Sequence, residues 1–433
     1  MSKRAALYQQ FNPARPLEAG EENLYVDWQR MLGLDDVKTR LAQSIALSGS
    51  TPVCRLFTGH RGVGKTTELK RVKRLLESGD AGAKLFVCFL EAERWMHPED
   101  ITSTDIVFHV ARQIVDDLKQ AGFDFGMTKL TEFFREFGEL LSSEVELKGI
   151  KIPVGPVELG VELKDNPVTR PILRRLLAGH QPRIFDLINQ VILKDAREWL
   201  RKPAHGGYED VLVIVDQLDR IPQKILNDRG LTNHENLFLD HAGELKFLNC
   251  DVLCTVPIEL AYSRCRERLK TAYAAEVLSL PVIPVVDRTG GTRGLDALRE
   301  IVRRRAAAEG MTREEAFQDD DTLNRLCRMS GGHVRNLFIL LRSAIERCPD
   351  LPITRDAVER TVRQQASDIL LPIRKKEWQA LQWVHEYRKP YDADADLWYG
   401  LLRDQMAFTY ADQSGVWYDW NPLFGEVPAG AAP

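Results

Sequence analysis

The sequence predicts an α/β protein in which a parallel sheet is followed by a helical region and a two-stranded ribbon. Residues 211–215 (VLVIV) form a continuous apolar run, which is typical of a strand buried on both faces of a parallel sheet. Such runs alternate with helical patterns between residues 37 and 286. That alternation favours parallel strands joined by helices. After Asp287 the composition changes and the pattern becomes helical.

The elements of the sheet region are expected in regular succession along the chain. Apolar residues at helical spacing predict helices at 37–47, 66–77, 105–121 and 182–200. Short apolar runs predict strands at 55–58, 84–90, 211–215, 252–256 and 282–286, the last interrupted by Pro284. Residues 122–182 are interpreted as an insertion that contains an acidic helix (133–141) and a hairpin-like alternating stretch (145–163).

The rest of the chain is predicted to be helical up to its final ribbon. Helices are expected at 295–308, then on to 346, at 354–369, at 375–387 and near Asp396. Strands at 406–410 and 416–420 flank a polar turn at 411–415, and helices that end in such a ribbon indicate a winged-helix module. The predicted domains are an N-terminal arm (1–22), a core (23–286), a helical lid (287–350), a winged-helix-like domain (351–424) and a disordered tail (425–433).

Net charge, hydrophobic runs and cysteine usage disfavour several classes of protein. The chain has 433 residues with 59 Lys and Arg against 63 Asp and Glu, a net charge of −4, which is unlike a strongly basic nucleic-acid binder. The longest aliphatic run has about five residues whereas a membrane span needs about 20, so no membrane partner is expected. Seven cysteines in mostly apolar surroundings fit a reducing compartment and a cytoplasmic location.

A glycine-rich loop carries the clearest chemistry. Residues 59–66 (GHRGVGKT) match G-x-x-x-x-G-K-[ST] between a predicted strand and a predicted helix. In such a loop the backbone N–H groups surround phosphate oxygens, the lysine reaches the β- and γ-phosphates and the hydroxyl binds Mg²⁺. The residues expected to bind the nucleotide here are Gly59, Arg61, Gly62, Val63, Gly64, Lys65, Thr66 and Thr67, with Thr66 also a metal ligand.

An acidic residue ends the predicted strand 211–215. Asp216 is therefore expected at the carboxyl edge of the sheet, where open α/β sheets bind ligands, and is predicted to hold Mg²⁺. Gln217 follows it and can orient a water molecule but cannot take its proton. Asp219 is the candidate for polarising that water, with helix N-capping as its alternative role. We expect slow hydrolysis from this arrangement.

These two motifs, GxxGxGKTT and VDQLD, resemble the AAA+/STAND group of P-loop ATPases. The resemblance implies a P-loop NTPase fold that binds ATP or ADP with Mg²⁺. It also implies that Thr255 is a sensor-1 residue, that Tyr25 and Val26 border the adenine, and that Arg335, in a segment similar to origin-initiator and transposition ATPases, contacts the γ-phosphate. The alternatives are a strand residue satisfied by its neighbours for Thr255, packing of the arm for Tyr25 and Val26, and a solvated helix charge for Arg335.

Further residues keep two interpretations open. His333 is a candidate for phosphate contact or helix capping. In related proteins an arginine from a neighbouring subunit follows the sensor-1 strand, and the candidates are Arg264, Arg266 and Arg268, which also fit an exposed basic face. The basic residues on the helix after the glycine-rich loop (Lys70, Arg71, Lys73, Arg74) and at 303–305 fit either DNA phosphates or a solvated surface.

The sequence therefore predicts a slowly hydrolysing ATP switch that controls a partner, an unidentified effector protein, and that forms a homo-oligomer if a neighbour supplies an arginine. The STAND resemblance implies a role in bacterial antiphage defence. A DNA-bound ATPase of the initiator type is the alternative, although three aspartates at 392–396 disfavour nucleic acid as the partner. A third hypothesis is a scaffold whose ATP is structural and rarely turned over.

Overall fold

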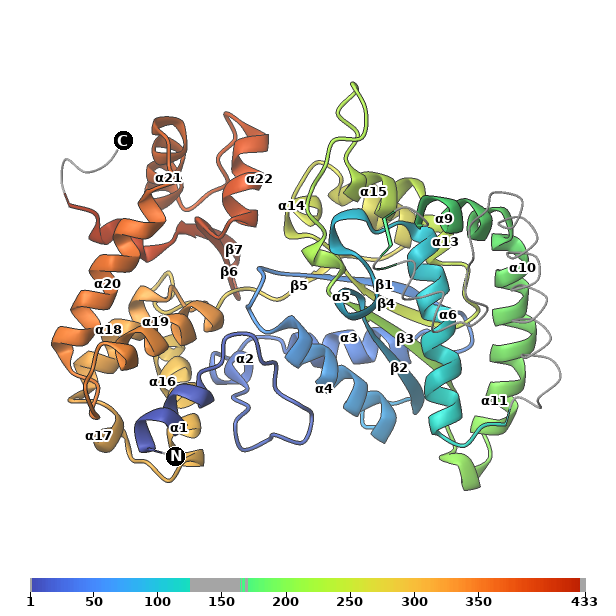
Figure 1. Cartoon of the computed structure of the whole chain (residues 1–433), viewed down its shortest axis with the longest axis horizontal. Coiled ribbons are helices and arrows are strands. Elements are labelled where there is room, and N and C mark those ends of the chain that lie inside the picture. Colours follow the sequence, from blue (N-terminus) through green and yellow to red (C-terminus); the bar gives the residue numbers. More distant parts are fainter. Residues whose placement is uncertain (1, 125–163, 165, 168–169, 429–433) are drawn as a thin grey trace. The chain divides into compact units, whose positions relative to one another are not determined.

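The computed structural model contains a five-stranded sheet of order β2-β3-β4-β1-β5 (Figure 1). The structure describes residues 2–124, 164, 166–167 and 170–428. The strands are β1 (Cys54–Thr58), β2 (Leu85–Glu91), β3 (Asp210–Asp216), β4 (Asp251–Thr255) and β5 (Leu278–Ser279). The pairs β2–β3, β3–β4 and β4–β1 are parallel. Four of the five predicted strands and the parallel sheet are thereby confirmed.

Two compact units make up the chain. The sheet unit comprises Lys38–Thr58 and Arg71–Leu278, and the helical unit comprises Met1–Val37, Gly59–Lys70 and Ser279–Pro433. The glycine-rich loop, which the sequence assigns to the core at 23–286, groups with the helical unit. The predicted domain limits remain predictions.

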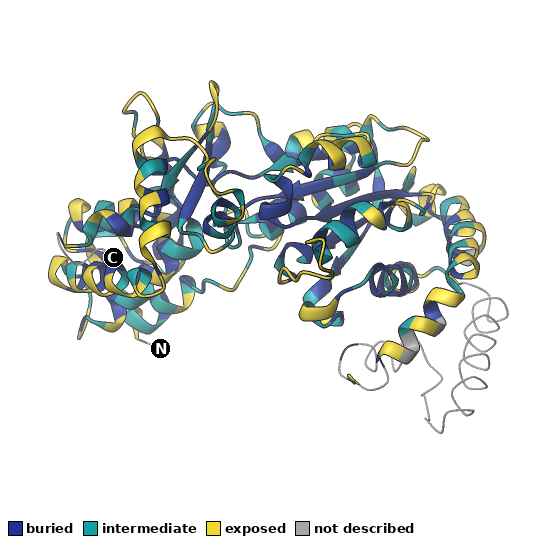
Figure 2. Ribbon diagram, turned by 90° about the horizontal axis from the view of Figure 1, so that it is seen from above, coloured by how far each residue is buried: buried dark blue, intermediate teal, exposed yellow. Residues whose placement is uncertain are grey.

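Apolar side chains on both faces explain why the sheet forms. Residues 211–215 of β3 are completely buried, and Figure 2 shows the strands of the sheet as buried ribbons. One face packs on a core to which α6 and the helical run 181–200 contribute. The helices of this region are α3 (Val37–Ala46), α4 (Lys65–Ser78), α5 (Ala92–Trp95), α6 (Ser103–Gln120), α9 (Arg170–Gly179), α10 (Gln181–Asp186), α11 (Lys194–Leu200), α12 (Asn233–Glu235), α13 (Ala242–Leu245), α14 (Ile258–Ala261) and α15 (Arg266–Tyr273).

Short turns connect these helices. A π-helical segment, Leu187–Leu193, joins α10 to α11, so the predicted helix 182–200 is continuous through three pieces. A second π-helical segment is Asn236–Asp240, and 3-10 turns lie at Pro98–Asp100, Pro203–His205 and Leu218–Arg220. The predicted acidic helix 133–141 and hairpin 145–163 lie outside the described residues. No helix in the described ranges is both long and apolar enough to span a bilayer.

The prediction of a strand at 282–286 was wrong. Pro281 and Pro284 have no N–H to donate to a strand ladder. The N–H of Val282 donates instead to the carbonyl of Thr409 at 3.0 Å, and β5 is limited to two residues before this segment. Val282 is thus bonded to the C-terminal ribbon of its own unit.

The helical unit contains the predicted lid helices and two helices that the sequence did not indicate, α1 and α2. Its helices are α1 (Lys3–Gln10), α2 (Trp28–Met31), α16 (Arg293–Ala308), α17 (Arg313–Ala316), α18 (Asp320–Met329), α19 (Val334–Glu346), α20 (Arg355–Leu370), α21 (Lys375–Tyr387) and α22 (Ala395–Arg403). The N-terminal arm holds α1, whose Leu7 is completely buried, as is the following Phe11. The Phe11 ring contacts that of Phe338 in α19. Burial of these two side chains stabilises an otherwise polar helix.

The final ribbon confirms the predicted hairpin. β6 (Ala407–Asp412) pairs antiparallel with β7 (Gly415–Trp420). A 3-10 turn, Pro422–Glu426, follows, and Glu426 forms an ion pair with Arg325 of α18 at 2.5 Å. This ion pair and the buried Phe424 anchor the turn, which includes residues 425 and 426. The disordered tail expected at 425–433 stays a prediction. Residues 429–433 lie outside the described part of the chain.

Candidate nucleotide-binding site

The glycine-rich loop follows Thr58 of β1 directly and leads into α4. Three of its residues have backbone angles that favour glycine: φ is 148° at Gly59, 87° at Gly62 and 113° at Gly64. Two of them also lie against neighbours. A Cβ on Gly59 would come within 2.6 Å of the Leu280 carbonyl oxygen, and one on Gly62 within 2.7 Å of the Arg335 side chain. The structure thus requires the glycines both for the turn and for close packing.

Lys65, the first residue of α4, is turned back onto its own loop. Its Nζ donates to the carbonyl oxygens of Gly59 at 2.6 Å and His60 at 2.8 Å. The side chain is buried. These bonds hold the ammonium group against the backbone of the loop that the motif expects to meet phosphate.

The beginning of α19 contacts the glycine-rich loop. His333 Nε2 donates to the carbonyl of Arg61 at 2.8 Å, and His333 Nδ1 accepts from the N–H of Asn336. Burial lowers the pKa of His333 to about 3, which keeps the ring neutral with its proton on Nε2. His333 therefore caps α19, one of its two predicted roles.

Arg335 lies across the loop. Its N–H donates to the Gly62 carbonyl at 3.3 Å, and its Nε donates to the Pro13 carbonyl of the arm. Arg335 is thus engaged with the loop and the arm, which differs from the solvated helix charge considered above. Its predicted contact with a γ-phosphate stays a prediction.

The C-terminal ribbon also contacts the loop. The N–H of Thr409 in β6 donates to His60 Nε2 at 3.0 Å, and Gln405 Nε2 donates to the Arg61 carbonyl at 3.0 Å. His60 is buried against Phe408, its ring edge-on to that of the phenylalanine. Sequence reasoning missed His60, Gln405 and Thr409. The motif leaves position 60 unspecified, and nothing local shows a partner some 350 residues away.

The N-terminal arm is attached to α4. The Tyr25 hydroxyl donates to the buried Glu68 carboxylate at 3.2 Å, and the Thr67 hydroxyl oxygen accepts from the N–H of Leu17 at 3.1 Å. The Arg304 guanidinium donates to the Tyr25 carbonyl, and Val26 is buried. The structure therefore provides the packing role considered for Tyr25 and Val26. Their contact with adenine stays a prediction.

The predicted acidic residues lie together in the sheet unit. Asp216 ends β3 and is 1% exposed, and its Oδ1 accepts from the N–H of Gln217 at 2.7 Å. Gln217 has a φ of 70°, and its Oε1 accepts from the N–H of Glu93. Asp219 is the middle residue of the 3-10 turn Leu218–Arg220, so it is not the N-cap of that turn, which is Gln217. The left-handed backbone conformation of Gln217 thus turns the chain between the carboxylates of Asp216 and Asp219.

Thr255 supports this turn. Its hydroxyl oxygen accepts from the N–H of Leu218 at 3.0 Å, and the residue is completely buried at the end of β4. This is the neighbour-satisfied strand role considered above. A direct contact of Thr255 with nucleotide stays a prediction.

The three candidate trans arginines differ in their surroundings. Arg268 is exposed but lies 3.5 Å from the Glu235 carboxylate, and Arg266 lies over the Tyr262 ring. Arg264 is exposed and has no hydrogen bond or ion pair with any described residue. Of the three, Arg264 has the guanidinium group available to a second molecule.

Acidic neighbours offset much of the charge in the basic clusters. Lys70 pairs with Glu18 at 2.5 Å and Lys73 with Glu77 at 2.6 Å. The Glu300 carboxylate forms ion pairs with both Arg303 and Arg304. Hydrogen bonds from these two arginines and their positive charges lower the pKa of Glu300 to about 2. The interpretation of a solvated or internally paired surface fits these contacts better than a DNA-binding face.

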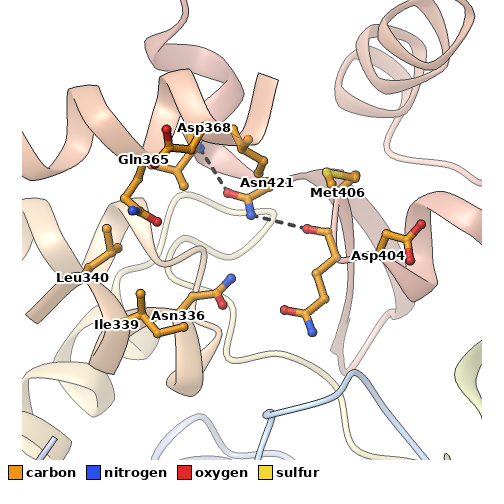
Figure 3. A pocket seen from close by; sticks show the side chains of 11 residues that line it. Asn336, Ile339, Leu340, Gln365, Asp368, Asp404, Met406 and Asn421 are labelled. Carbon is orange, nitrogen blue, oxygen red and sulfur yellow. Dashed lines mark hydrogen bonds between the residues drawn. The ribbon is translucent and has the colours of Figure 1, made fainter. Parts of the chain in front are cut away.

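A pocket of about 310 Å³ opens between α19, α20 and the entry to β6 (Figure 3). Ile339 and Leu340 of α19 line one side together with the amide of Asn336, and Gln365, Asp368 and Asn421 lie on the opposite side. Asn421 Nδ2 donates to the Gln405 carbonyl at 3.3 Å. The lining residues are Asn336, Ile339, Leu340, Gln365, Asp368, Ile369, Asp404, Gln405, Met406, Asn421 and Leu423.

Comparisons with known proteins find similarity in structure and none in sequence families. No protein-family model and no curated protein matches the sequence. The structure is similar to the ORC2 protein of Aeropyrum pernix in ADPNP–ADP complexes, with 13% identity over 96% of this chain and 93% of that chain and a TM-score of 0.42. It is also similar to the ORC1 protein of Aeropyrum pernix in complex with DNA, with 14% identity over 97% of this chain and 94% of that chain and a TM-score of 0.40. A Walker-type ATPase of Pyrococcus abyssi has 13% identity over 96% of this chain and 98% of that chain and a TM-score of 0.46.

The class of the fold follows from the chain's own features. The sheet order β2-β3-β4-β1-β5, the glycine-rich loop between β1 and α4, and an acidic residue at the end of β3 define a P-loop NTPase fold. The predicted fold class is confirmed. The STAND subtype stays a prediction.

Proposed function

We propose that the protein binds ATP and ADP and hydrolyses ATP slowly as a molecular switch. The observation that carries this proposal is the buried Lys65 ammonium inside a glycine loop with three positive φ angles. A lysine and glycines in a loop of this motif are the groups that bind the phosphates of a nucleotide in P-loop proteins.

Mg²⁺ fits the oxygen groups that the chain offers. Hard divalent cations prefer hydroxyl and carboxylate oxygens, and Mg²⁺ in phosphate sites is bound by one or two such protein ligands and by substrate phosphates. Thr66 and Asp216 are the proposed ligands. When bound, the metal would neutralise charge on the phosphates, while Lys65 holds the β- and γ-phosphates and Gln217 orients a water molecule.

Slow turnover follows from the residue after Asp216. An amide at Gln217 cannot accept the proton of the attacking water, which leaves Asp219 as the carboxylate available one turn later. The same feature is compatible with a scaffold that holds ATP without turning it over. Measured hydrolysis above that of Lys65→Ala supports the switch, and equal rates support the scaffold.

A protein partner is favoured over DNA. The basic clusters are largely paired with acids of the same chain. In addition Asp392, Asp394 and Asp396 are exposed at the start of α22. These exposed aspartates repel the phosphate backbone of DNA. The initiator-like alternative would instead be supported by DNA binding that weakens steeply as the salt concentration rises.

The first experiment is the solution mass of the purified chain with ADP, with a slowly hydrolysed ATP analogue and with neither. A defined oligomer with the analogue alone supports a switch whose output is assembly. A mass that does not change shows that the output lies in a partner. The proposed setting of antiphage defence is tested by plaque counts on cells that carry the wild-type chain or Lys65→Ala.

A further inference from the structure

One residue of the phosphate loop touches both the phosphate-binding lysine and the C-terminal ribbon. The carbonyl of His60 accepts from Lys65 Nζ at 2.8 Å. The ring of the same residue accepts from the N–H of Thr409 at 3.0 Å. Three residues of the helical unit, one of them in β6, are thus joined by two hydrogen bonds.

The surroundings of His60 leave it little freedom to move alone. The ring is 1% exposed and lies edge-on to Phe408 at a centroid distance of 5.6 Å. Burial, together with the nearby His333 and Lys65, holds the pKa of His60 well below its usual range. The ring is therefore neutral, and Nε2 is the atom that accepts, because a backbone N–H can only donate.

A second connection runs through the next carbonyl of the loop. The Arg61 oxygen accepts from both His333 Nε2 and Gln405 Nε2. Gln405 has a φ of 61°, an uncommon value for a residue with a side chain, and it immediately precedes Met406 and β6. Asn421 Nδ2 donates to its carbonyl beside the pocket in Figure 3. Strained residues persist where the surrounding structure holds them, and they concentrate at switch regions.

Phosphate binding would act on these bonds. A nucleotide phosphate attracts the Lys65 ammonium, which then has to leave one or both of the Gly59 and His60 carbonyls. Because the carbonyl and ring of His60 belong to one buried residue, a change in its peptide group is passed to Thr409. A movement of the adjacent Arg61 peptide group would be passed to the same strand through the hydrogen bond from Gln405.

We propose that His60 and Gln405 are positioning residues that couple phosphate binding in the loop to the β6–β7 ribbon. The proposal rests on the proposed nucleotide binding and names its regulation. It makes the ribbon the element that responds to nucleotide, and it makes the coupling reciprocal, so that a partner holding the ribbon changes nucleotide affinity by the same factor.

Amide hydrogen exchange on the full chain tests the coupling. Saturating Mg²⁺ with ADP or with a slowly hydrolysed ATP analogue is expected to change exchange at residues 407–412 by about fivefold or more. In His60→Phe, which keeps the ring volume and removes the acceptor, this response is lost while nucleotide still binds. His60→Gln, whose amide oxygen can accept from Thr409, retains it.

A matched histidine provides the control. His385 Nδ1 bonds Asp419 of β7 at 2.7 Å, and no bond of His385 to the phosphate loop occurs among the described residues. His385→Phe is expected to keep the nucleotide response of β6. Gln405→Ala removes a half-buried side chain and serves as the second variant if His60→Phe does not fold; it is expected to weaken the response.

The outcomes separate the two proposals. Nucleotide binding without any response at 407–412 overturns the coupling and leaves the proposed function intact. A wild-type response in both His60→Phe and Gln405→Ala also overturns it. No binding of ADP or ATP at about 1 mM overturns both, because this value lies at the upper end of usual substrate affinities.

Discussion

The backbone N–H of Thr409 donates to the ring of His60 at 3.0 Å, although the two residues are 349 positions apart in the sequence. This bond joins the loop that carries the phosphate-binding motif to the first strand of the C-terminal ribbon. Its counterpart is the bond from Gln405 to the Arg61 carbonyl. Together they make the ribbon a neighbour of the phosphate loop within the helical unit.

Lys65 is predicted to carry nucleotide affinity. Lys65→Ala removes the ammonium group inside the loop, and we expect ADP and ATP to bind about 100-fold more weakly and hydrolysis to vanish. The matched control is Lys70→Ala on the same helix. Lys70 pairs with the mostly exposed Glu18, so its loss is expected to change nucleotide affinity little. Equal effects of the two substitutions in a fluorescent-nucleotide titration would contradict the site.

Gln217 is predicted to limit the rate of hydrolysis. Gln217→Glu places a carboxylate beside the proposed position of the attacking water. General-base assistance should then raise turnover by about 10- to 100-fold. The new oxygen can still accept from the N–H of Glu93, so the turn is preserved. Steady-state phosphate release measures the effect. No gain in Gln217→Glu combined with complete loss in Asp219→Asn would assign the base to Asp219 alone.

Arg264 is predicted to act in a neighbouring subunit if the chain assembles. Arg264→Ala should lower turnover by about 10³-fold, as loss of an arginine finger does. Arg268→Ala is the control, because that guanidinium already lies beside Glu235. An equimolar mixture of Arg264→Ala with Asp216→Asn should regain activity, since one interface then combines an intact arginine with an intact site. A mixture as inactive as its components would refute the role in trans.

His333 is predicted to make the helical unit less stable in acid. Its pKa in the folded chain is about 3 against about 6.5 when unfolded. The unfolded state therefore binds the proton first, and stability is lost as the pH falls below 6.5. As the pH falls from 7.5 to 5.5, this histidine should lower the free energy of unfolding by about 1.4 kcal/mol.

The variant His333→Asn isolates that contribution. Asparagine also caps helices but does not titrate. The difference in free energy of unfolding between the wild type and His333→Asn should therefore shrink by about 1.4 kcal/mol over the same pH range. A difference that stays constant with pH in urea titrations would show that the ring is not held neutral.

Asp251 is predicted to destabilise the sheet unit at neutral pH. Burial raises its pKa to about 6, although its Oδ1 accepts from the N–H of Val53 at 2.9 Å. A raised carboxyl pKa means that stability is greatest below pH 3.8 and is lost as the pH rises toward 6. Asp251→Asn keeps the acceptor without the charge. It should raise the free energy of unfolding by about 2 kcal/mol more at pH 8 than at pH 4.

Local patterns were sufficient for most of the architecture and for the phosphate loop. Most helices and strands predicted in the described part of the chain lie within a few residues of their places, because the pattern reflects burial on one or both faces of each element. The strand expected at 282–286 failed for a nonlocal reason: the N–H of Val282 bonds β6. The helix α1 was missed because its apolar residues pack on α16 and α19, which are distant in the sequence.

The sequence by itself determined the fold class, the glycine loop with Lys65, and the acidic end of β3, since each depends on residues that are close together in the chain. The tertiary structure alone decided which roles the ambiguous residues take. It made His333 a helix cap, Thr255 a support for the turn after Asp216, and His60 a contact of Thr409. The physical reason is that a hydrogen bond depends on positions within about 3 Å, and for distant residues those positions exist only once the chain has folded.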